Sequence, residues 1–288
     1  MANAATVSVD RSTDGNEPEF DMTDRDFNTI AELADRHTGI VLGPHKRTMV
    51  YGRIARRIRA TGLVSFQRYL AYLEQHPDQE LSHFINAITT NLTSFFREPH
   101  HFHFLDQQLL PRLKLKNSAS KRLRIWSAGC SIGQEAYTIA ISVLRAGFPK
   151  DWDIRILATD LDSNVLATGE QGIYPLDHIE SLDAEVKRNH FRPTPDGRSV
   201  QINADLRNMV HFKRLNLLES WPMNGPFDLI FCRNVVIYFN KDSQRMLFDH
   251  FADYLAADGH LCIGHSENLA GVSERFQPLG QTVYRKIR

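Results

Sequence analysis

A turn rich in small residues stands where the chain could bind a nucleoside. Residues 127–135 (SAGCSIGQE) follow an apolar run and lead into a helical pattern, and Asp160 ends the next apolar run. Small residues let the backbone approach a ligand closely, and an acidic side chain at the end of a second strand is suited to bind a ribose diol. These residues predict a site for a cofactor that contains a nucleoside.

The glycine spacing narrows the choice of cofactor. Gly129 and Gly133 do not form the G-x-G-x-x-G pattern that holds the pyrophosphate of a dinucleotide. S-adenosylmethionine has a ribose and no phosphate, so it fits this turn better. Glu135 either binds the cationic end or the ribose of the cofactor, or it only caps its own helix. The spacing alone leaves both roles open.

The pattern after residue 120 predicts the elements that position the turn. Short apolar runs typical of strands alternate with amphipathic runs typical of helices. Such alternation indicates a parallel sheet covered on both faces, with the ligand at the carboxyl ends of the strands. The expected strands are 123–128, 154–159, 210–215, 227–232 and 260–263, and the expected helices are 132–146, 163–171 and 241–256.

Residues 172–207 interrupt this alternation. Pro175, Pro193, Pro195 and Gly197 break regular structure, and residues 199–202 alternate like an exposed strand. We predict a small antiparallel β-subdomain inserted into the α/β domain, which spans 121–288.

Residues 20–98 predict a helical domain. Apolar residues recur at helical spacing in a first helix that Thr23 caps and Gly39 ends, and then in helices at 45–60, 66–75 and 79–90. The helix predicted at 45–60 contains no acidic residue, and its arginines predict a basic surface. They are Arg53, Arg56, Arg57 and Arg59. Polar residues 1–19 predict a disordered arm, and residues 99–120 are interpreted as a linker between the domains.

Composition excludes several classes of protein. The 288 residues hold 34 Lys and Arg against 34 Asp and Glu, so no net charge attracts the chain to nucleic acid or membrane. No apolar stretch approaches the roughly 18 residues that span a bilayer. Residues 1–20 also lack the basic start and apolar middle of a signal peptide, so we expect a cytoplasmic location. The three cysteines lack C-x-x-C spacing, which indicates reduced thiols. His100, His101 and His103 lack the partner spacing of a metal site, so we expect no metal.

Three further segments stand out beside the turn at 127–135: 90–98 (TNLTSFFRE), 231–239 (FCRNVVIYF) and 264–267 (GHSE). Together the four segments resemble the CheR family of chemotaxis receptor methyltransferases, and the similarity runs from about Phe20 to Tyr284. The resemblance implies an S-adenosylmethionine-dependent O-methyltransferase that esterifies glutamates on the cytoplasmic helices of receptors and releases S-adenosylhomocysteine. It also implies an α/β fold with a helical N-terminal domain, a Rossmann-like domain and an inserted β-subdomain. Whether that subdomain binds a tethering peptide at receptor tails, as in some family members, stays open.

The resemblance also implies which residues form the site. Arg97 and Tyr238 resemble residues near the transferred methyl group. Positions that resemble the cofactor contacts of the family, together with the glycine of the turn, are Asn91, Thr93, Arg97, Gly129, Glu135, Asp160, Asn216, Leu217, Arg233 and Asn234. The chain departs from the usual Thr, Glu and Pro of the family at Ile132, Gln134 and Ala136, where the geometry of the cofactor site can differ.

The chemistry of the transfer agrees with these residue types. A glutamate carboxylate, with a pKa of about 4.3, is already anionic at pH 7, so attack on a sulfonium methyl group needs no strong base. A fixed guanidinium and a phenol, such as Arg97 and Tyr238, can orient the carboxylate. The arginines of the second helix can complement the glutamates of a receptor helix.

Two other functions are compatible with parts of the sequence. One is an RNA or DNA methyltransferase whose basic helix binds phosphates, although the chain is neutral and has no Asn-Pro-Pro-Tyr segment for a flipped adenine. The other is a catalytically silent adaptor that binds S-adenosylmethionine as a sensor, which Arg97, Asp160 and Tyr238 argue against. We expect a monomer that neither binds nucleic acid nor inserts into a membrane.

Overall fold

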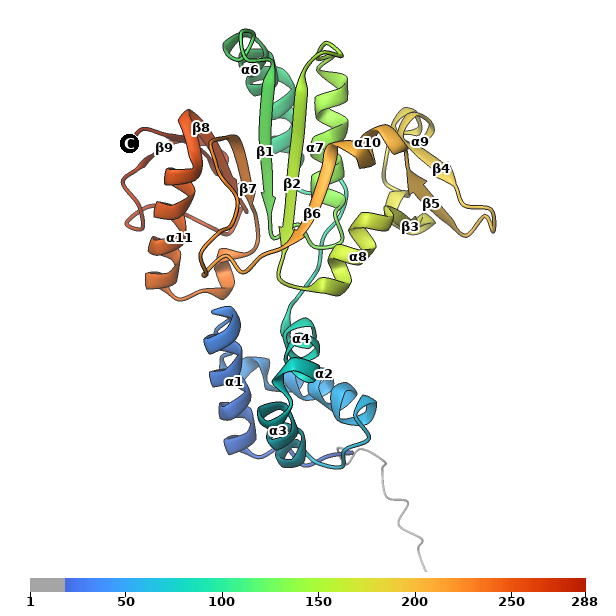
Figure 1. Cartoon of the computed structure of the whole chain (residues 1–288), viewed down its shortest axis with the longest axis vertical. Helices are drawn as coiled ribbons and strands as arrows, with labels where there is room; N and C mark the ends of the chain where they lie inside the picture. The colour runs from blue at the N-terminus through green and yellow to red at the C-terminus, as the bar shows by residue number, and fades with distance from the viewer. Residues whose placement is uncertain (1–18) are drawn as a thin grey trace, which may run out of the picture.

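The computed structural model describes residues 19–288. The arm expected at 1–19 lies outside these residues except for Glu19. Figure 1 shows a helical domain at one end of the molecule, a domain built on a large sheet at the other, and a small β-subdomain beside the sheet. Among the described residues, no helix has the length and apolar character needed to cross a membrane.

The helical domain has the helices that the sequence predicts. They are α1 (Asp24–Thr38), α2 (Arg47–Ala60), α3 (Phe66–Gln75) and α4 (Pro77–Ile88), with a short 3-10 turn, η1 (Pro44–Lys46), before α2. Thr23 caps α1 in a capping box with Asp26, and Gly39 ends it in the left-handed conformation. Apolar side chains of all four helices, such as Ile30, Ile54 and Phe84, pack in one fully buried core.

The linker expected at 99–120 is helical over most of its length, so that interpretation is wrong. The segment forms α5 (Pro99–Phe104), a π-helical turn, η2 (Leu105–Leu109), and α6 (Leu110–Lys116). Leu105, Leu109 and Leu110 are buried in the core of the sheet domain because their spacing places them on one helical face. The chain instead passes between the domains at 89–98, which has no helix or strand.

The central sheet has the strand order β6-β2-β1-β7-β8-β10-β9. The five predicted strands are present and parallel: β1 (Arg122–Ala128), β2 (Asp153–Asp160), β6 (Val210–Arg214), β7 (Phe227–Cys232) and β8 (Leu255–Ile263). Two strands that the sequence did not predict, β9 (Phe276–Gly280) and β10 (Val283–Lys286), make the sheet mixed, since β10 runs antiparallel to both neighbours. Most residues of β9 are exposed and the strand has no apolar run, so the sequence pattern did not indicate it.

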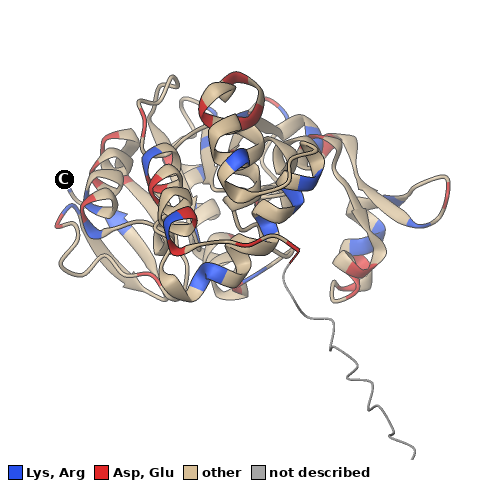
Figure 2. Ribbon diagram, turned by 90° about the horizontal axis from the view of Figure 1, so that it is seen from below, with Lys and Arg blue, Asp and Glu red and all other residues tan. Residues whose placement is uncertain are grey.

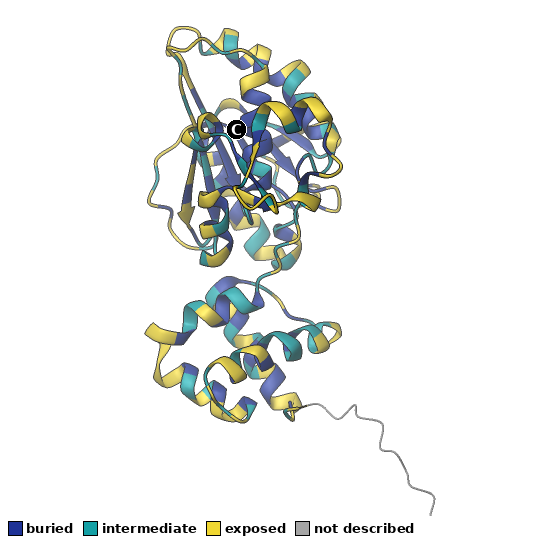
Figure 3. Ribbon diagram, turned by 90° about the vertical axis from the view of Figure 1, so that its right-hand side faces the viewer, coloured by how far each residue is buried: buried dark blue, intermediate teal, exposed yellow. Residues whose placement is uncertain are grey.

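Helices cover both faces of the sheet, as predicted. α7 (Gln134–Arg145) and α8 (Ser163–Gln171) follow β1 and β2, and α11 (Lys241–Tyr254) precedes β8. Alternate residues of β1 enter two separate cores, with Ile125 in one and Trp126 in the other. In Figure 3 the buried strands lie between helices that are exposed on their outer sides.

The inserted β-subdomain is also confirmed. Its strands are β3 (Ile173–Pro175), β4 (Phe191–Pro193) and β5 (Ser199–Ile202), antiparallel in the order β3-β5-β4, with η3 (Leu176–Ile179), α9 (Ala184–His190) and α10 (Ala204–Met209) around them. Phe95 packs edge to face on Tyr174 and on Phe191, with ring centroids 5.1 and 5.3 Å apart. The segment between the domains therefore also anchors the β-subdomain.

Basic and acidic residues are interspersed along the ribbon in Figure 2. This distribution agrees with the net charge of +0. A charged partner must therefore be met by a local patch.

Candidate active site

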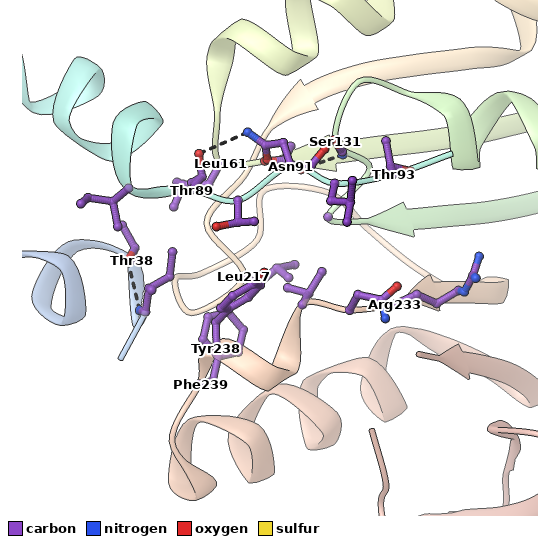
Figure 4. A pocket seen from close by; sticks show the side chains of 18 of the residues that line it. Thr38, Thr89, Asn91, Thr93, Ser131, Leu161, Leu217, Arg233, Tyr238 and Phe239 are labelled. Atoms are coloured by element: carbon purple, nitrogen blue, oxygen red, sulfur yellow. Dashed lines mark hydrogen bonds between the residues drawn. The ribbon is translucent and has the colours of Figure 1, made fainter. Parts of the chain in front are cut away.

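A cavity lies between the carboxyl ends of the parallel strands and the helical domain. Residues from both domains line it, and Figure 4 shows Asn91, Thr93 and Ser131 along one wall with Tyr238 and Phe239 along the opposite wall. The structure brings together all the residues predicted for cofactor binding and catalysis: Asn91, Thr93, Arg97, Gly129, Glu135, Asp160, Asn216, Leu217, Arg233, Asn234 and Tyr238. The arginines of α2 are not part of the lining.

The helical domain contributes lining residues that sequence reasoning missed. They are Thr38, Ile40, Leu42, Lys46, Met49 and Ile88. Met49 and Ile88 lie in helices where their spacing indicated only packing, and no sequence signal distinguished the others. Ser131, Leu161, Val235 and Phe239 were missed as well, although Ser131 lies within the turn and Leu161 directly follows Asp160.

The turn after β1 brings backbone close to the cavity. Gly129 has a φ of 83°, and a Cβ at this position would lie 2.3 Å from Cγ2 of Val235. The amides of Gly129 and Cys130 both donate to the carbonyl of Thr159 at the end of β2, at 2.8 and 2.9 Å. The turn therefore requires glycine at this point, as the close approach of backbone to a ligand predicts.

Asp160 is held at the end of β2 by backbone donors. One carboxylate oxygen accepts from the amide of Ser131 at 2.8 Å, and the other accepts from the amide of Asp162 at 3.0 Å. Burial raises the pKa of Asp160. Carboxylate oxygens have further lone pairs, so this fixed side chain can still accept hydrogen bonds from a ribose diol.

Glu135 binds side chains and not the start of its own helix. Its Oε1 accepts from Oγ of Ser127 at 2.6 Å, and its Oε2 lies 3.1 Å from Nη1 of Arg233. Burial raises the pKa of Glu135, and the charge of Arg233 opposes this effect. The start of α7 therefore has no capping hydrogen bond from this side chain, although Glu135 lies in the first turn, and the residue forms part of the cavity wall.

Glu98 is a residue of this network that sequence reasoning missed. It accepts from Nδ1 of His265 at 2.9 Å, and Nη2 of the buried Arg233 lies 3.2 Å away. Burial opposes its ionisation, but hydrogen bonds from His265 and the charge of Arg233 lower the pKa of Glu98 to about 2. Glu98 therefore joins the segment between the domains to the loops after β7 and β8. Its only sequence signal was its place in the 90–98 segment.

One group of side chains near the cavity has the residue types of a metal site. The ligand atoms of Glu98, His100 and His101 lie within 4.8 Å of one another. The guanidinium of Arg233 contacts the same carboxylate, and this positive charge disfavours a cation there. Burial, with the charge of Arg233, lowers the pKa of His101 to about 4, so it is neutral at pH 7. That no metal is used stays a prediction.

Glu267 fixes the loop that follows β7. Its carboxylate is 5% exposed and accepts from the backbone amides of Asn234, Val235, Val236 and Gly264. Three of these donors belong to the loop that carries Asn234 and leads to Tyr238. The 264–267 segment thus acts by orienting cavity residues, a role that the sequence did not reveal.

Asn91 and Asn216 connect the two domains through their side-chain amides. Nδ2 of Asn91 donates to the carboxylate of Asp162 at 2.8 Å. The backbone carbonyl of Asn91 accepts from Oγ of Ser131 at 3.0 Å. Nδ2 of Asn216 donates to the carbonyl of His37 at 3.1 Å. Both residues line the cavity as expected, and both also hold its walls together.

Arg97 and Tyr238 come from different sides of the domain junction. Nη1 of Arg97 donates to the carbonyl of Leu92 at 2.7 Å. The carbonyl of Tyr238 accepts from the amide of Val41 at 2.9 Å, and Nζ of Lys46 lies 5.3 Å from the centre of its ring. Lys46 is therefore a further cation at the cavity that sequence reasoning did not assign.

The arginines of α2 do not form one free basic surface, and that expectation is wrong for two of them. Nε and Nη2 of Arg57 both bind the carboxylate of Glu80 at 2.8 Å. Arg53 donates to the carbonyls of Ile88 and Thr89. Arg56 and Arg59 are exposed, and Nε of Arg59 lies 3.2 Å from Oε2 of the exposed Glu19. The sequence showed no acid within α2, but Glu80 comes from α4.

The three departures from the usual pattern of the family do not line the cofactor cavity. Ile132, Gln134 and Ala136 are absent from its lining. The backbone carbonyl of Ile132 accepts from the hydroxyl of Tyr174 at 2.7 Å. The side-chain nitrogen Nε2 of Gln134 lies 3.1 Å from Nδ1 of His178. Two of these positions therefore contact the β-subdomain.

Comparison with known proteins agrees with this geometry. Residues 25–89 match the family described as CheR methyltransferase, all-alpha domain, and residues 91–285 match CheR methyltransferase, SAM binding domain. The two matches meet at the segment where the chain passes between the domains.

Curated relatives cover nearly the whole chain. It is 42% identical over 270 residues to chemotaxis protein methyltransferase 2 of Pseudomonas aeruginosa, covering 92% of this chain and 94% of the relative. It is 43% identical over 269 residues to the chemotaxis protein methyltransferase of Salmonella typhimurium (91% and 90%) and 40% identical over 269 residues to that of Escherichia coli (91% of each). The chain therefore belongs to the CheR family and is an S-adenosylmethionine-dependent chemotaxis protein methyltransferase.

Proposed function

We propose that the protein methylates glutamate side chains on the cytoplasmic helices of chemoreceptors and forms glutamyl methyl esters there. The observation that carries the proposal is the cavity itself, where Asp160 lies at the end of β2, Glu135 lies in the first turn of α7, and Arg97 and Tyr238 line the same space. S-adenosylmethionine supplies an electrophilic sulfonium methyl group. The names of the relatives, chemotaxis protein methyltransferases, support a receptor as the acceptor.

The residues at the end of β2 and at the junction of β1 with α7 fit this cofactor. Asp160, held by two backbone amides, accepts hydrogen bonds from the ribose diol. Glu135 accepts a hydrogen bond from the cationic end of the cofactor or from its ribose. The guanidinium of Arg233 balances the negative charge of Glu135. Gly129 gives the backbone room to approach the ligand.

Arg97 and Tyr238 orient the attacking carboxylate. The guanidinium of Arg97 is held on one side by the carbonyl of Leu92, which leaves other donors for a substrate carboxylate. The carboxylate is anionic at pH 7, so these residues position it and no proton has to be removed.

The test is transfer of a radiolabelled methyl group to receptor and to nucleic acid by the full chain. Label on the receptor that base releases indicates glutamyl esters and supports the proposal. Label on nucleic acid that base leaves in place indicates a nucleic-acid methyltransferase. Binding of S-adenosylmethionine without transfer to either indicates an adaptor and contradicts the proposal.

We expect Asp160→Asn to weaken binding of S-adenosylhomocysteine by about 10- to 100-fold. The change keeps the size but removes the charge, and a hydrogen bond to a charged group contributes roughly 1.5–3 kcal/mol, with about 1.4 kcal/mol per tenfold. Calorimetric titration measures the affinity. Asp205→Asn, an exposed position on α10, is the matched control. Unchanged affinity in Asp160→Asn would remove this carboxylate from the cofactor site.

We propose that Arg56 and Arg59 contribute to receptor recognition. Both are exposed on α2, so Arg56→Glu with Arg59→Glu should raise the KM for receptor by about 3- to 10-fold at low salt and flatten its salt dependence. Affinity for S-adenosylhomocysteine should not change. The double variant Arg112→Glu with Arg122→Glu makes the same change of charge at exposed sites outside the cavity. Equal effects of the two pairs would show only a general effect of charge.

A further inference from the structure

Arg97 stands between two residues with left-handed backbone. Phe96 and Glu98 have φ angles of 53° and 57°, in a region that residues other than glycine rarely adopt. Backbone of this kind persists only where surrounding contacts hold it, and it is frequent at functional sites. The contacts of Phe96 and Glu98 therefore help to decide where the side chain of Arg97 points.

The guanidinium of Arg97 depends on this backbone for its direction. Within residues 19–288 it makes one hydrogen bond, from Nη1 to the carbonyl of Leu92 at 2.7 Å. On the N-terminal side, the amide of Phe96 donates to Oγ1 of Thr138 at 3.2 Å. One flank of Arg97 is thus anchored to α7, which carries Thr138.

Glu98 anchors the other flank to the loops after β7 and β8. Its side chain is 9% exposed. Oε1 accepts from the backbone amide of His265 at 3.3 Å and from Nδ1 of the same residue at 2.9 Å, and Oε2 lies 3.2 Å from Nη2 of Arg233. That nitrogen of Arg233 also donates to the backbone carbonyl of Arg97. One guanidinium therefore binds Arg97 and Glu98 at neighbouring positions.

Arg233 also connects this flank to the cofactor site. Its side chain is 2% exposed, and Nη1 lies 3.1 Å from Oε2 of Glu135 in the cavity wall. One buried guanidinium thus lies between two carboxylates, one in the wall of the cofactor cavity and one beside Arg97. Buried charges need partners, so removal of the Glu98 carboxylate would let Arg233 shift toward Glu135 and away from the carbonyl of Arg97.

We propose that Glu98 is a positioning residue for methyl transfer: it holds the backbone that aims the guanidinium of Arg97 at the acceptor carboxylate. Glu98 is absent from the lining of the cavity, so it acts through Arg97 and does not touch the substrate. This inference rests on the proposed function and deepens it. Alignment matters at this step, because a displacement of about 1 Å from the productive geometry can cost about 10²-fold in rate.

The experiment is a double-mutant cycle on the full-length protein, with single-turnover transfer of a labelled methyl group to receptor as the readout. Glu98→Gln keeps the size of the side chain but removes the charge that pairs with Arg233. We expect it to lower the transfer rate by about 10- to 100-fold. In the Arg97→Ala background the same change should cost less than about twofold, because the guanidinium that Glu98 positions is already gone. A residue with only a structural role would lower the rate in both backgrounds.

Further variants separate positioning from folding. Glu98→Asp keeps the charge on a shorter side chain and should recover part of the rate. His265→Ala removes one partner of Glu98 at a side chain that is 66% exposed, so the fold should be kept while the rate falls less than in Glu98→Gln. This loss should also vanish in the Arg97→Ala background. Glu170→Gln, at an exposed carboxylate on α8 that does not line the cofactor cavity, is the matched control and should leave the rate unchanged.

Binding of S-adenosylhomocysteine checks that the cofactor site is intact. Its affinity should change by less than about fivefold in Glu98→Gln, because Glu135 keeps Arg233 as its partner. Equal losses of rate in the wild-type and Arg97→Ala backgrounds, or wild-type rates in both Glu98→Gln and His265→Ala, would overturn the inference and leave the proposed function intact. If the wild-type protein transfers no base-labile label to receptor, the proposed function fails, and this inference fails with it.

Discussion

Replacing Arg97 with alanine is expected to lower the turnover of receptor methylation by about 10²- to 10³-fold, the scale for loss of one preorganised electrostatic group. The guanidinium lines the cavity, and its hydrogen bond to the carbonyl of Leu92 fixes its position. Single-turnover transfer of a labelled methyl group measures the effect on the chemical step apart from product release. Arg97→Lys keeps the charge but loses the planar fork, so it should recover only part of the rate.

Tyr238→Phe is the companion variant for the same step. Only the hydroxyl is removed, so turnover should fall while the affinity for S-adenosylhomocysteine changes less. The backbone bond between Val41 and Tyr238 does not involve the side chain and should be kept. Near-normal methylation rates in both Arg97→Ala and Tyr238→Phe would contradict the roles proposed for these residues.

Arg57→Ala is expected to reduce the free energy of unfolding by about 3–5 kcal/mol, since it leaves an ionised group buried without its partner. Glu80 is 3% exposed, both of its oxygens bind Arg57, and one also accepts from the hydroxyl of the fully buried Tyr69 at 2.9 Å. The pair joins α2 to α4. Denaturant unfolding monitored by circular dichroism measures the loss.

Neighbouring variants make this result specific. Arg56→Ala, one residue away and exposed, should change stability by about 0.5 kcal/mol or less. Glu80→Gln in the Arg57→Ala background should recover part of the loss, because it removes the unpaired charge. Equal losses in Arg56→Ala and Arg57→Ala would mean that the buried pair is not the cause. If the pair is the cause, a charge reversal at Arg57 cannot test receptor recognition, because it destabilises the helical domain.

The sequence predicted the local elements well because each has a local cause. Thr23 and Gly39 bound α1 through their own capping geometry, and the apolar runs at 123–128 and 227–232 form central strands. The small residues of the 127–135 turn and Asp160 lie at the cavity because parallel strands bring their carboxyl ends to one edge of the sheet. The resemblance to the family supplied the remaining lining residues that were predicted.

Other features depend on which surfaces meet, and these the sequence could not reveal. Residues 99–120 were interpreted as a linker, yet the segment folds into helices whose apolar side chains, such as Leu105, Leu109 and Leu110, are buried in the core of the sheet domain. Strand β10 and the edge strand β9 lack apolar runs; β10 pairs with β8, and β9 pairs with β10.

The same limit applies to the site. By itself, the sequence determined the helical, α/β and inserted domains, the cofactor turn with Asp160, and, through the family resemblance, Arg97 and Tyr238. Only the tertiary structure decided that Glu80 takes Arg57 out of the basic surface and that Glu98 joins Arg233 to His265. The physical reason is range. Capping, periodicity and turn chemistry act over a few residues, whereas these contacts join side chains from 23 to 167 positions apart, which only the packed fold brings together.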